Sequence, residues 1–168
     1  TWGAFTYPVA FFITDITNRR YGPQKARWIV FAGFIVAVFL SIWFATPRIA
    51  IASGTAFLTA QLIDVTIFSK LRNSKWWKAP LISSSIGSVI DTIIFFSIAF
   101  SASSVFFGSN DDFALSQISF FGMDFIQVPR WFSWAVGDLV VKFIVALALL
   151  FPFAMIRNKI GVWKEFKI

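Results

Sequence analysis

The sequence predicts an all-α fold: a polytopic transmembrane helix bundle that forms a single domain over residues 1–168. Hydrophobic residues make up 58% of the chain and charged residues only 14%. The mean hydropathy is +0.76, whereas a soluble domain of this length needs more polar surface. The apolar residues gather in five long runs, and clusters of basic residues lie between these runs. Long apolar runs flanked by positive charge are typical of membrane spans.

The five apolar runs define the expected spans, in order residues 2–17, 27–45, 49–69, 80–100 and 131–156. As a helix, the run 27–45 covers about 28 Å, which is enough to cross the hydrocarbon. The first run is short, and Gly3 and Pro8 interrupt it, as in the broken helices that transporters place at binding sites. The apolar residues of segment 101–130 are too dispersed to span, so we expect an external loop that lies partly in the interface.

The distribution of Lys and Arg predicts the orientation. Twelve of the fifteen lie between the first two spans, between the third and fourth, or after the fifth, whereas the opposite side holds only Arg48 and Arg130. The positive-inside rule therefore places these three clusters and the C-terminus in the cytoplasm. Tryptophans mark the outer ends at Trp2, Trp43, Trp131 and Trp134, and the inner ends at Trp28, Trp76, Trp77 and Trp163. This is the arrangement of an aromatic belt.

Five spans with an inner C-terminus put Thr1 outside, so we expect a further helix upstream, which makes six. Cys and His are absent, which excludes disulfides, thiol nucleophiles, imidazole bases and the common zinc sites. The net charge of +7 reflects membrane orientation rather than nucleic-acid binding, because the basic residues flank the spans. We therefore expect no enzyme activity, no cofactor, no metal site and no nucleic-acid partner; the expected partners are the bilayer and a small molecule.

Five charged residues lie inside the expected spans, at Asp15, Asp64, Asp91, Asp138 and Lys142. Each costs about 2.5–3.5 kcal/mol to insert at mid-bilayer on translocon scales, so such groups face a protein interior, pair with one another or meet a substrate. Asp91 and Lys142 lie near the middle of their spans. We expect these groups to converge on one polar chamber that a flat heterocycle can occupy.

Neighbouring residues extend this set. Gln61 shares a helix face with Asp64 at i, i+3, and Ser88 lies one turn before Asp91. The first span adds aromatic rings at Phe5, Tyr7, Phe11 and Phe12, and stacking of a base on such a ring is worth about 1–3 kcal/mol. We predict that the substrate-binding residues are Asp15, Gln61, Asp64, Ser88, Asp91 and Lys142.

Most of these groups also have a local explanation. Asp15 can pair with Arg19 one turn on, and Asp64 can be drawn to the cytoplasmic basic loops. The i, i+4 pair of Asp138 and Lys142 can be purely structural, and serines can bond back to their own helix. The fourth-span carboxylate has no cation near it in the sequence, so it is the hardest to explain without a function.

Four blocks of the sequence resemble the queuosine precursor transporter family, also called the vitamin uptake transporter family. The blocks are residues 1–27, TWGAFTYPVAFFITDITNRRYGPQKAR; residues 51–72, IASGTAFLTAQLIDVTIFSKLR; residues 76–100, WWKAPLISSSIGSVIDTIIFFSIAF; and residues 136–153, VGDLVVKFIVALALLFPF. They occur in the family's order and cover nearly the whole chain except residues 101–130. The resemblance implies a six-helix bacterial inner-membrane protein that imports 7-cyano-7-deazaguanine and 7-aminomethyl-7-deazaguanine.

Two other interpretations stay open. The chain can be the substrate-binding subunit of an ATP-driven vitamin importer, or a membrane scaffold that transports nothing and whose buried charges only specify helix pairing. We expect a homodimer, because one such unit is small for an alternating-access carrier. The driving force, whether protons, sodium or metabolic trapping, is open as well.

Overall fold

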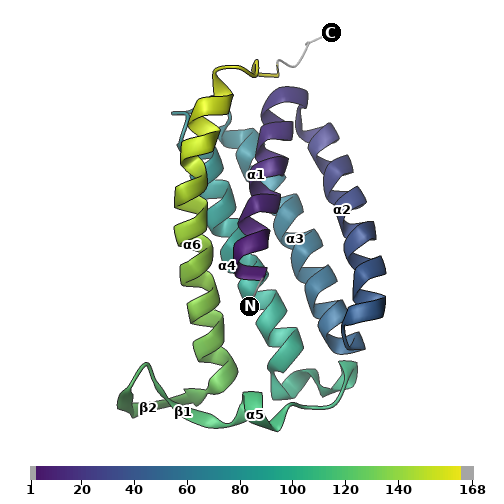
Figure 1. Cartoon of the computed structure of the whole chain (residues 1–168), viewed down its shortest axis with the longest axis vertical. Helices are drawn as coiled ribbons and strands as arrows, with labels where there is room; N and C mark the ends of the chain where they lie inside the picture. Colours follow the sequence, from purple (N-terminus) through teal and green to yellow (C-terminus); the bar gives the residue numbers. More distant parts are fainter. Residues whose placement is uncertain (1–2, 164–168) are drawn as a thin grey trace.

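The computed structural model describes residues 3–163, without the side chain of Asp124, as a bundle of five long helices closed at one end by a short irregular segment (Figure 1). The long helices are α1 (Gly3–Tyr21), α2 (Pro23–Phe44), α3 (Pro47–Leu71), α4 (Lys78–Phe100) and α6 (Arg130–Arg157). The segment between α4 and α6 holds the 3-10 helix η1 (Ala102–Phe107), the single turn α5 (Asp112–Leu115) and the strands β1 (Gln117–Phe120) and β2 (Met123–Pro129).

The all-α prediction is confirmed, but the number of spans is not. Within the described residues, four helices are long and apolar enough to cross a membrane, namely α2, α3, α4 and α6. Their bounds lie within a few residues of the predicted spans. Helix α1, the first predicted span, is not among these four helices, because Asp15, Arg19 and Arg20 lie in its second half and lower its hydropathy.

Helix α1 is also continuous, so the expected interruption at Gly3 and Pro8 is wrong. Pro8 lies inside the helix and is buried. A proline removes one backbone hydrogen bond and tends to bend a helix, but α1 continues through Pro8. Helix α1 lies in the bundle with contacts to α2, α3, α4 and α6.

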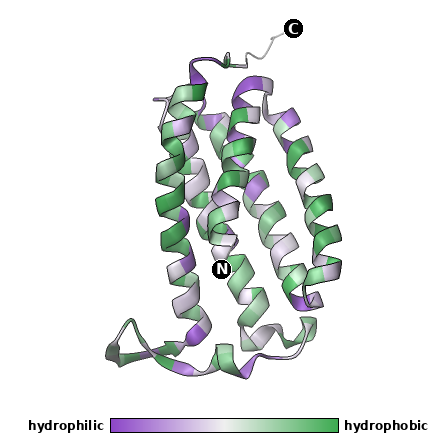
Figure 2. Ribbon diagram, viewed as in Figure 1, coloured by the Kyte–Doolittle hydropathy of each residue, from purple (hydrophilic) through white to green (hydrophobic). Residues whose placement is uncertain are grey.

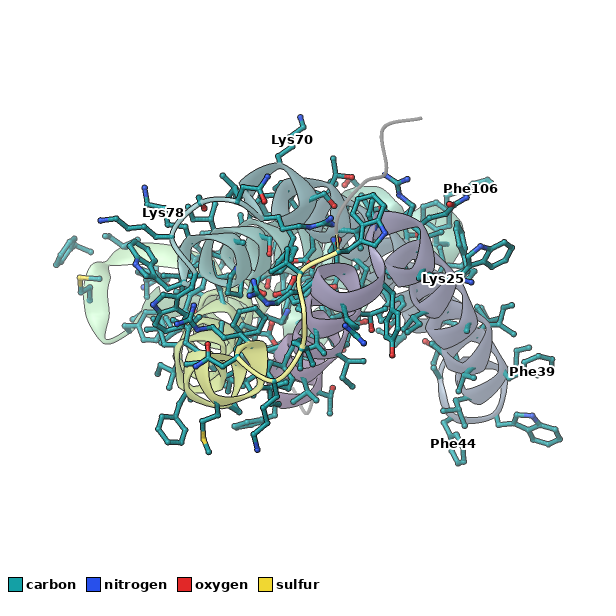
Figure 3. All side chains as sticks on the ribbon, turned by 90° about the horizontal axis from the view of Figure 1, so that it is seen from above. Lys25, Phe39, Phe44, Lys70, Lys78 and Phe106 are labelled. Atoms are coloured by element: carbon teal, nitrogen blue, oxygen red, sulfur yellow. The ribbon has the colours of Figure 1, made fainter. Side chains whose placement is uncertain are left out.

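The ends of the helices that carry the basic clusters lie together at one end of the bundle, opposite the segment 101–129 (Figure 1). Hydrophilic colour gathers at this basic end and around the segment at the other end (Figure 2). Lys70 and Lys78 extend outward from the basic end when the bundle is seen from above (Figure 3). Four residues of the sequence argument, Thr1, Trp2, Lys164 and Lys167, lie outside the described residues.

The burial pattern is inverted relative to a soluble protein. The most exposed large side chains include Trp43, Phe44 and Phe151, at 81%, 85% and 73% exposure, and Phe39 and Phe44 project from α2 at the edge of the bundle (Figure 3). The buried set, by contrast, contains aspartates, a lysine, a glutamine and several serines. An apolar exterior over a polar interior is the pattern of a protein whose helices face lipid.

The segment 101–130 is more ordered than the predicted loop. Its two strands form an antiparallel hairpin in which Gln117 pairs with Pro129, and the turn residues Phe121 and Gly122 both have positive φ, 47° and 82°. Positive φ at both positions is typical of a two-residue hairpin turn, and Gly122 adopts it without a steric penalty. The sequence analysis missed this hairpin, because alternation over four residues is too short to distinguish from a loop.

Arg48 fastens this segment to the helices. Its side chain is 5% exposed, and its guanidinium donates hydrogen bonds to the carbonyl oxygens of Ile98 (2.8 Å), Ser101 (2.5 Å), Gly108 (3.2 Å) and Ser109 (2.9 Å) and to Oδ1 of Asn110 (3.1 Å). All three nitrogen atoms of the guanidinium take part in these bonds: Nε and Nη2 donate one each, and Nη1 has three acceptors within reach. One side chain from the first turn of α3 therefore holds the end of α4 and the chain that follows it.

Three helices meet at Gly87 of α4. A Cβ atom at this position would lie 2.8 Å from the ring of Phe11 on α1 and 3.5 Å from the carbonyl oxygen of Ala60 on α3. Phe11 and Ala60 are both 0% exposed, so neither has free space to move into. The small residue lets α1, α3 and α4 approach closely, which brings the polar faces of these helices together.

We predict that Gly87→Ala lowers the free energy of unfolding by about 1–3 kcal/mol, because the new methyl group overlaps a buried ring. Gly137→Ala is the matched control, since a Cβ atom there meets nothing within 4 Å and alanine favours a helix by about 1 kcal/mol over glycine. Thermal unfolding of the two purified variants in detergent measures the difference. Equal stability of the two variants would contradict close packing at Gly87.

Candidate functional site

The ammonium group of Lys142 on α6 joins three oxygen atoms in the interior. It lies 2.6 Å from Oδ2 of Asp91 and 2.5 Å from Oδ2 of Asp138, and donates to Oγ1 of Thr92 at 2.9 Å. An ammonium has three N–H donors, so these contacts use all of them. The predicted i, i+4 pair of Asp138 and Lys142 is confirmed, and Asp91 from α4 completes it.

Two carboxylates therefore share one ammonium, which leaves a formal charge of −1 if all three groups are ionised. Asp91, Asp138 and Lys142 are 2%, 5% and 2% exposed. Their charges are compensated only in part, and Oδ1 of Asp91 is buried with no hydrogen-bond partner. An unpaired carboxylate oxygen in a low-dielectric interior is costly, so it marks a place where a donor from elsewhere binds favourably.

A cavity of about 150 Å³ opens beside this group. It is lined by Gly3, Tyr7, Ser53, Asp91, Phe95, Asp138 and Lys142. The lining thus combines two aromatic rings with the partly compensated charges, a combination that suits a flat polar molecule.

Tyr7 forms the wall of the cavity that comes from α1. Its ring lies 5.4 Å from Nζ of Lys142 and packs edge-on against Phe57, with centroids 6.0 Å apart. Its hydroxyl donates to the carbonyl oxygen of Ser53 at 3.5 Å. These contacts fix the ring beside the charged group, where its position next to Lys142 is a favourable cation–π arrangement.

A second polar group lies at another level of the bundle. Asp15 on α1 and Asp64 on α3 are 1% and 0% exposed. They lie side by side, because Asn18, one turn after Asp15, donates its Nδ2–H to the carbonyl oxygen of Val65, next to Asp64, at 2.9 Å. The hydroxyls of Ser83 and Ser84 on α4 donate to Asp15 at 3.5 and 3.4 Å. Within the part of the chain that the structure describes, neither carboxylate forms an ion pair, so Asp15 does not use Arg19.

Gln61 and Ser88 are the remaining predicted site residues. Both are 0% exposed, and the amide nitrogen and oxygen of Gln61 and the hydroxyl of Ser88 have no hydrogen-bond partner. Buried amides and hydroxyls without partners are uncommon, because each loses its hydrogen bonds to water and forms none within the protein. The interpretation that this serine bonds back to its own helix does not hold.

The structure thus places all six predicted residues in the interior but does not gather them around one chamber. Asp91 and Lys142 line the cavity, whereas Asp15 and Asp64 belong to the second group. Among the lining residues that the prediction left out, Ser53 and Phe95 carry no signal that separates them from packing residues. Tyr7 was noticed only as one of several aromatic residues.

A bundle of apolar helices around a charged interior defines a multi-pass membrane protein. The chain belongs to the family described as "Putative vitamin uptake transporter", whose sequence pattern matches residues 1–46 and 39–156. The family and its named relatives are transporters, not enzymes.

Three relatives carry names that mention queuosine. A Haemophilus influenzae protein named "Probable queuosine precursor transporter" is 40% identical over 121 residues, which is 60% of this chain and 52% of the relative. The Escherichia coli "Queuosine precursor transporter" is 31% identical over 173 residues, covering 90% of this chain and 70% of the relative. A Bacillus subtilis protein named as the first is 29% identical over 128 residues, 60% of this chain and 56% of its own.

The matched parts thus span about half of two of these relatives and 70% of the third. No solved structure is significantly similar to the chain.

We predict that Lys142→Met lowers the free energy of unfolding by about 3–5 kcal/mol, because it leaves two buried carboxylates without their cation. The triple variant Lys142→Met, Asp91→Asn, Asp138→Asn removes all three charges and should recover much of this loss. Lys70→Met, at an exposed position, is the control for the loss of a lysine. Thermal unfolding in detergent ranks the variants, and a triple variant no more stable than the single one would contradict the charge-balance argument.

Proposed function

We propose that the protein imports 7-deazaguanine precursors of queuosine, in both the cyano and the aminomethyl forms, and that the substrate occupies the cavity beside Asp91. The observation that carries the proposal is the unpartnered Oδ1 of Asp91 in a cavity wall that also contains aromatic rings. The names of the relatives supply the substrate class.

The chemistry of the cavity suits such a ligand. A deazaguanine is planar, and its ring N–H and amino groups can donate side by side to one carboxylate, here Asp91. The rings of Tyr7 and Phe95 offer faces to the heterocycle, and stacking on an aromatic ring contributes about 1–3 kcal/mol. The formal charge of −1 around Lys142 favours the aminomethyl form, which carries a cation; the cyano form relies on hydrogen bonds and stacking.

Lys142 acts through its carboxylate neighbours in this arrangement. Its donors are already used by Asp91, Thr92 and Asp138, so it holds Asp91 ionised and oriented toward the cavity instead of donating to the ligand. Gln61 and Ser88 retain unused hydrogen-bonding capacity, which the substrate can use when the helices move to open the inner side.

Orientation and location follow from the same proposal. The basic end of the bundle faces the cytoplasm, with the C-terminus on that side, and the protein lies in the bacterial cytoplasmic (inner) membrane. The support is that the basic clusters of the described residues share one end of the bundle (Figure 1). We also propose a homodimer, since α2 buries only Ala26 and Val30 and leaves most of its surface for a partner or lipid.

We predict that Asp91→Asn weakens binding of both precursors by about 10–100-fold, the effect of losing a charged hydrogen bond of about 1.5–3 kcal/mol. The variant keeps the shape of the side chain and leaves Lys142 paired with Asp138. Titration of the purified full-length protein with labelled precursors, and uptake into liposomes that contain this protein alone, measure the effect.

Asp111→Asn is the matched control, because Asp111 is exposed and caps α5, a role that asparagine also performs. Uptake only in the presence of a separate ATPase would favour the binding-subunit alternative. The absence of any ligand-dependent rise in melting temperature would favour the scaffold alternative, because a ligand that binds the folded state must stabilise it. Wild-type affinity in Asp91→Asn would overturn the proposed site.

A further inference from the structure

The carboxyl pair of Asp15 and Asp64 has no explanation in the substrate cavity. Neither residue lines that cavity, and neither is accessible, at 1% and 0% exposure. Within residues 3–163, the hydrogen bonds to Asp15 come from the hydroxyls of Ser83 and Ser84, at the long distances of 3.5 and 3.4 Å. Both oxygens of Asp64 are buried without a hydrogen-bond partner if the group is ionised.

A single proton resolves this geometry. Two ionised carboxylates only accept hydrogen bonds, so at close range they repel each other and satisfy nothing. One proton held between them turns a repulsive contact into an O–H···O⁻ hydrogen bond, which is short and strong. Carboxyl pairs that share a site hold one proton for this reason, and the proton belongs to the pair.

No other charge offers compensation. On α1 the nearest cation in sequence is Arg19, whose Nε is without a partner and which forms no ion pair with Asp15 in the described chain. Helix α4 contributes only the two serine hydroxyls. Helix α6 faces Asp15 with the apolar residues Ala146, Leu149, Leu150 and Phe153, and α2 packs Ala26 and Val30 beside Val65, the neighbour of Asp64. Lys142 is occupied by its own carboxylates.

A metal cation does not fit the same place. The free space beside Asp15 amounts to about 10 Å³, about the room of a single water molecule and too little for a cation with its ligand shell. Hard cations such as sodium, calcium or magnesium need several oxygen ligands around them, and within residues 3–163 no group of three or more acidic residues could hold a metal ion. A proton needs no coordination shell, which makes it the ligand that the space allows.

The pair lies on the basic-end side of the substrate cavity. Along α4, Ser84 contacts Asp15 and Asp91 contacts Lys142. Ser84 and Asp91 are seven positions apart, which corresponds to about 10 Å of helix rise. Ser88 lies between these two levels on the same face of α4, and its hydroxyl has no hydrogen-bond partner. On α3 the amide of Gln61, one turn before Asp64, also lies between the two levels and also has no partner. These unpartnered polar groups point to a polar path between the cavity and the carboxyl pair.

We infer that Asp15 and Asp64 together bind one proton, and that this proton is the coupling ion that enters the cell with each substrate molecule. The inference rests on the proposed function and deepens it, because it assigns the driving ion to two residues outside the substrate cavity. The loaded pair carries one negative charge instead of two, so the bundle can open on the basic side. Release of the proton to the cytoplasm restores the repulsion between the two carboxylates.

The first test concerns the proton alone and needs no transport. Infrared spectroscopy of the purified full-length protein at neutral pH should show a C=O stretch of a protonated, buried carboxyl group. This band should shift in Asp15→Asn and in Asp64→Asn, because the partner of the remaining carboxyl group has changed, should disappear in the double variant, and should persist unchanged in the control Asp111→Asn. A wild-type spectrum without such a band, or a band unchanged in both pair variants, would overturn the inference whatever the protein transports.

The second test measures coupling in liposomes with the uncharged cyano precursor, whose distribution does not respond to membrane potential by itself. One proton per substrate should give about tenfold accumulation for each pH unit of an inward proton gradient, abolished by a protonophore. Asp64→Asn and Asp15→Asn should lose this accumulation but keep exchange of labelled for unlabelled precursor at equal pH. Asparagine mimics the protonated form, so folding should be preserved.

The outcomes separate the two proposals. If the wild type takes up and exchanges the precursor but its accumulation does not depend on the pH gradient, proton coupling is contradicted and the proposed function is not. Gradient-driven accumulation that persists in both asparagine variants would also overturn it. Absence of any precursor uptake or exchange by the wild type would instead overturn the proposed function, and the infrared test would still decide whether the pair holds a proton.

Discussion

The bond network of Lys142 is the constraint on which the interior depends. An isolated ammonium or carboxylate in hydrocarbon is too costly to keep, so α4 and α6 must hold their charged faces together at one level. The contacts of 2.5 and 2.6 Å between Lys142 and its two carboxylates satisfy this demand. Because two acids share one base, the compensation is incomplete. The excess negative charge and the unpartnered Oδ1 of Asp91 are direct consequences.

The four apolar helices could be predicted from the sequence, because hydropathy over about twenty residues is a strong signal and lipid demands it. Two features could not. Helix α1 has too many polar residues to read as an ordinary span, and Pro8 suggested a break, yet tertiary packing against four other helices keeps it continuous. The β1–β2 hairpin depends on one strand of four residues, one of seven and a single turn at Gly122, which is too little local pattern to recognise.

For the site, depth in the membrane was sufficient to predict which residues are buried. Ion pairs could be predicted from the sequence only where both residues lie on one helix, as Asp138 and Lys142 do. The contact between Asp91 and Lys142 joins residues 51 positions apart, and no periodicity reports such a distance. The same limit explains why the charges were expected to form one chamber: the sequence does not reveal that Asp15 faces Asp64 at one level while Asp91 faces Lys142 at another.

Arg48 has a consequence for how the segment after α4 can evolve. Four of its five acceptors are backbone carbonyl oxygens, and every residue type supplies a carbonyl. These bonds from Arg48 are therefore compatible with substitution of the residues whose carbonyl oxygens accept them. Position 108 is the exception, since Gly108 has a φ of 154° and a Cβ there would lie 3.1 Å from Cβ of Arg48. We therefore expect the residues of this segment to vary widely among related sequences, while the arginine at position 48 and the glycine at position 108 stay the same.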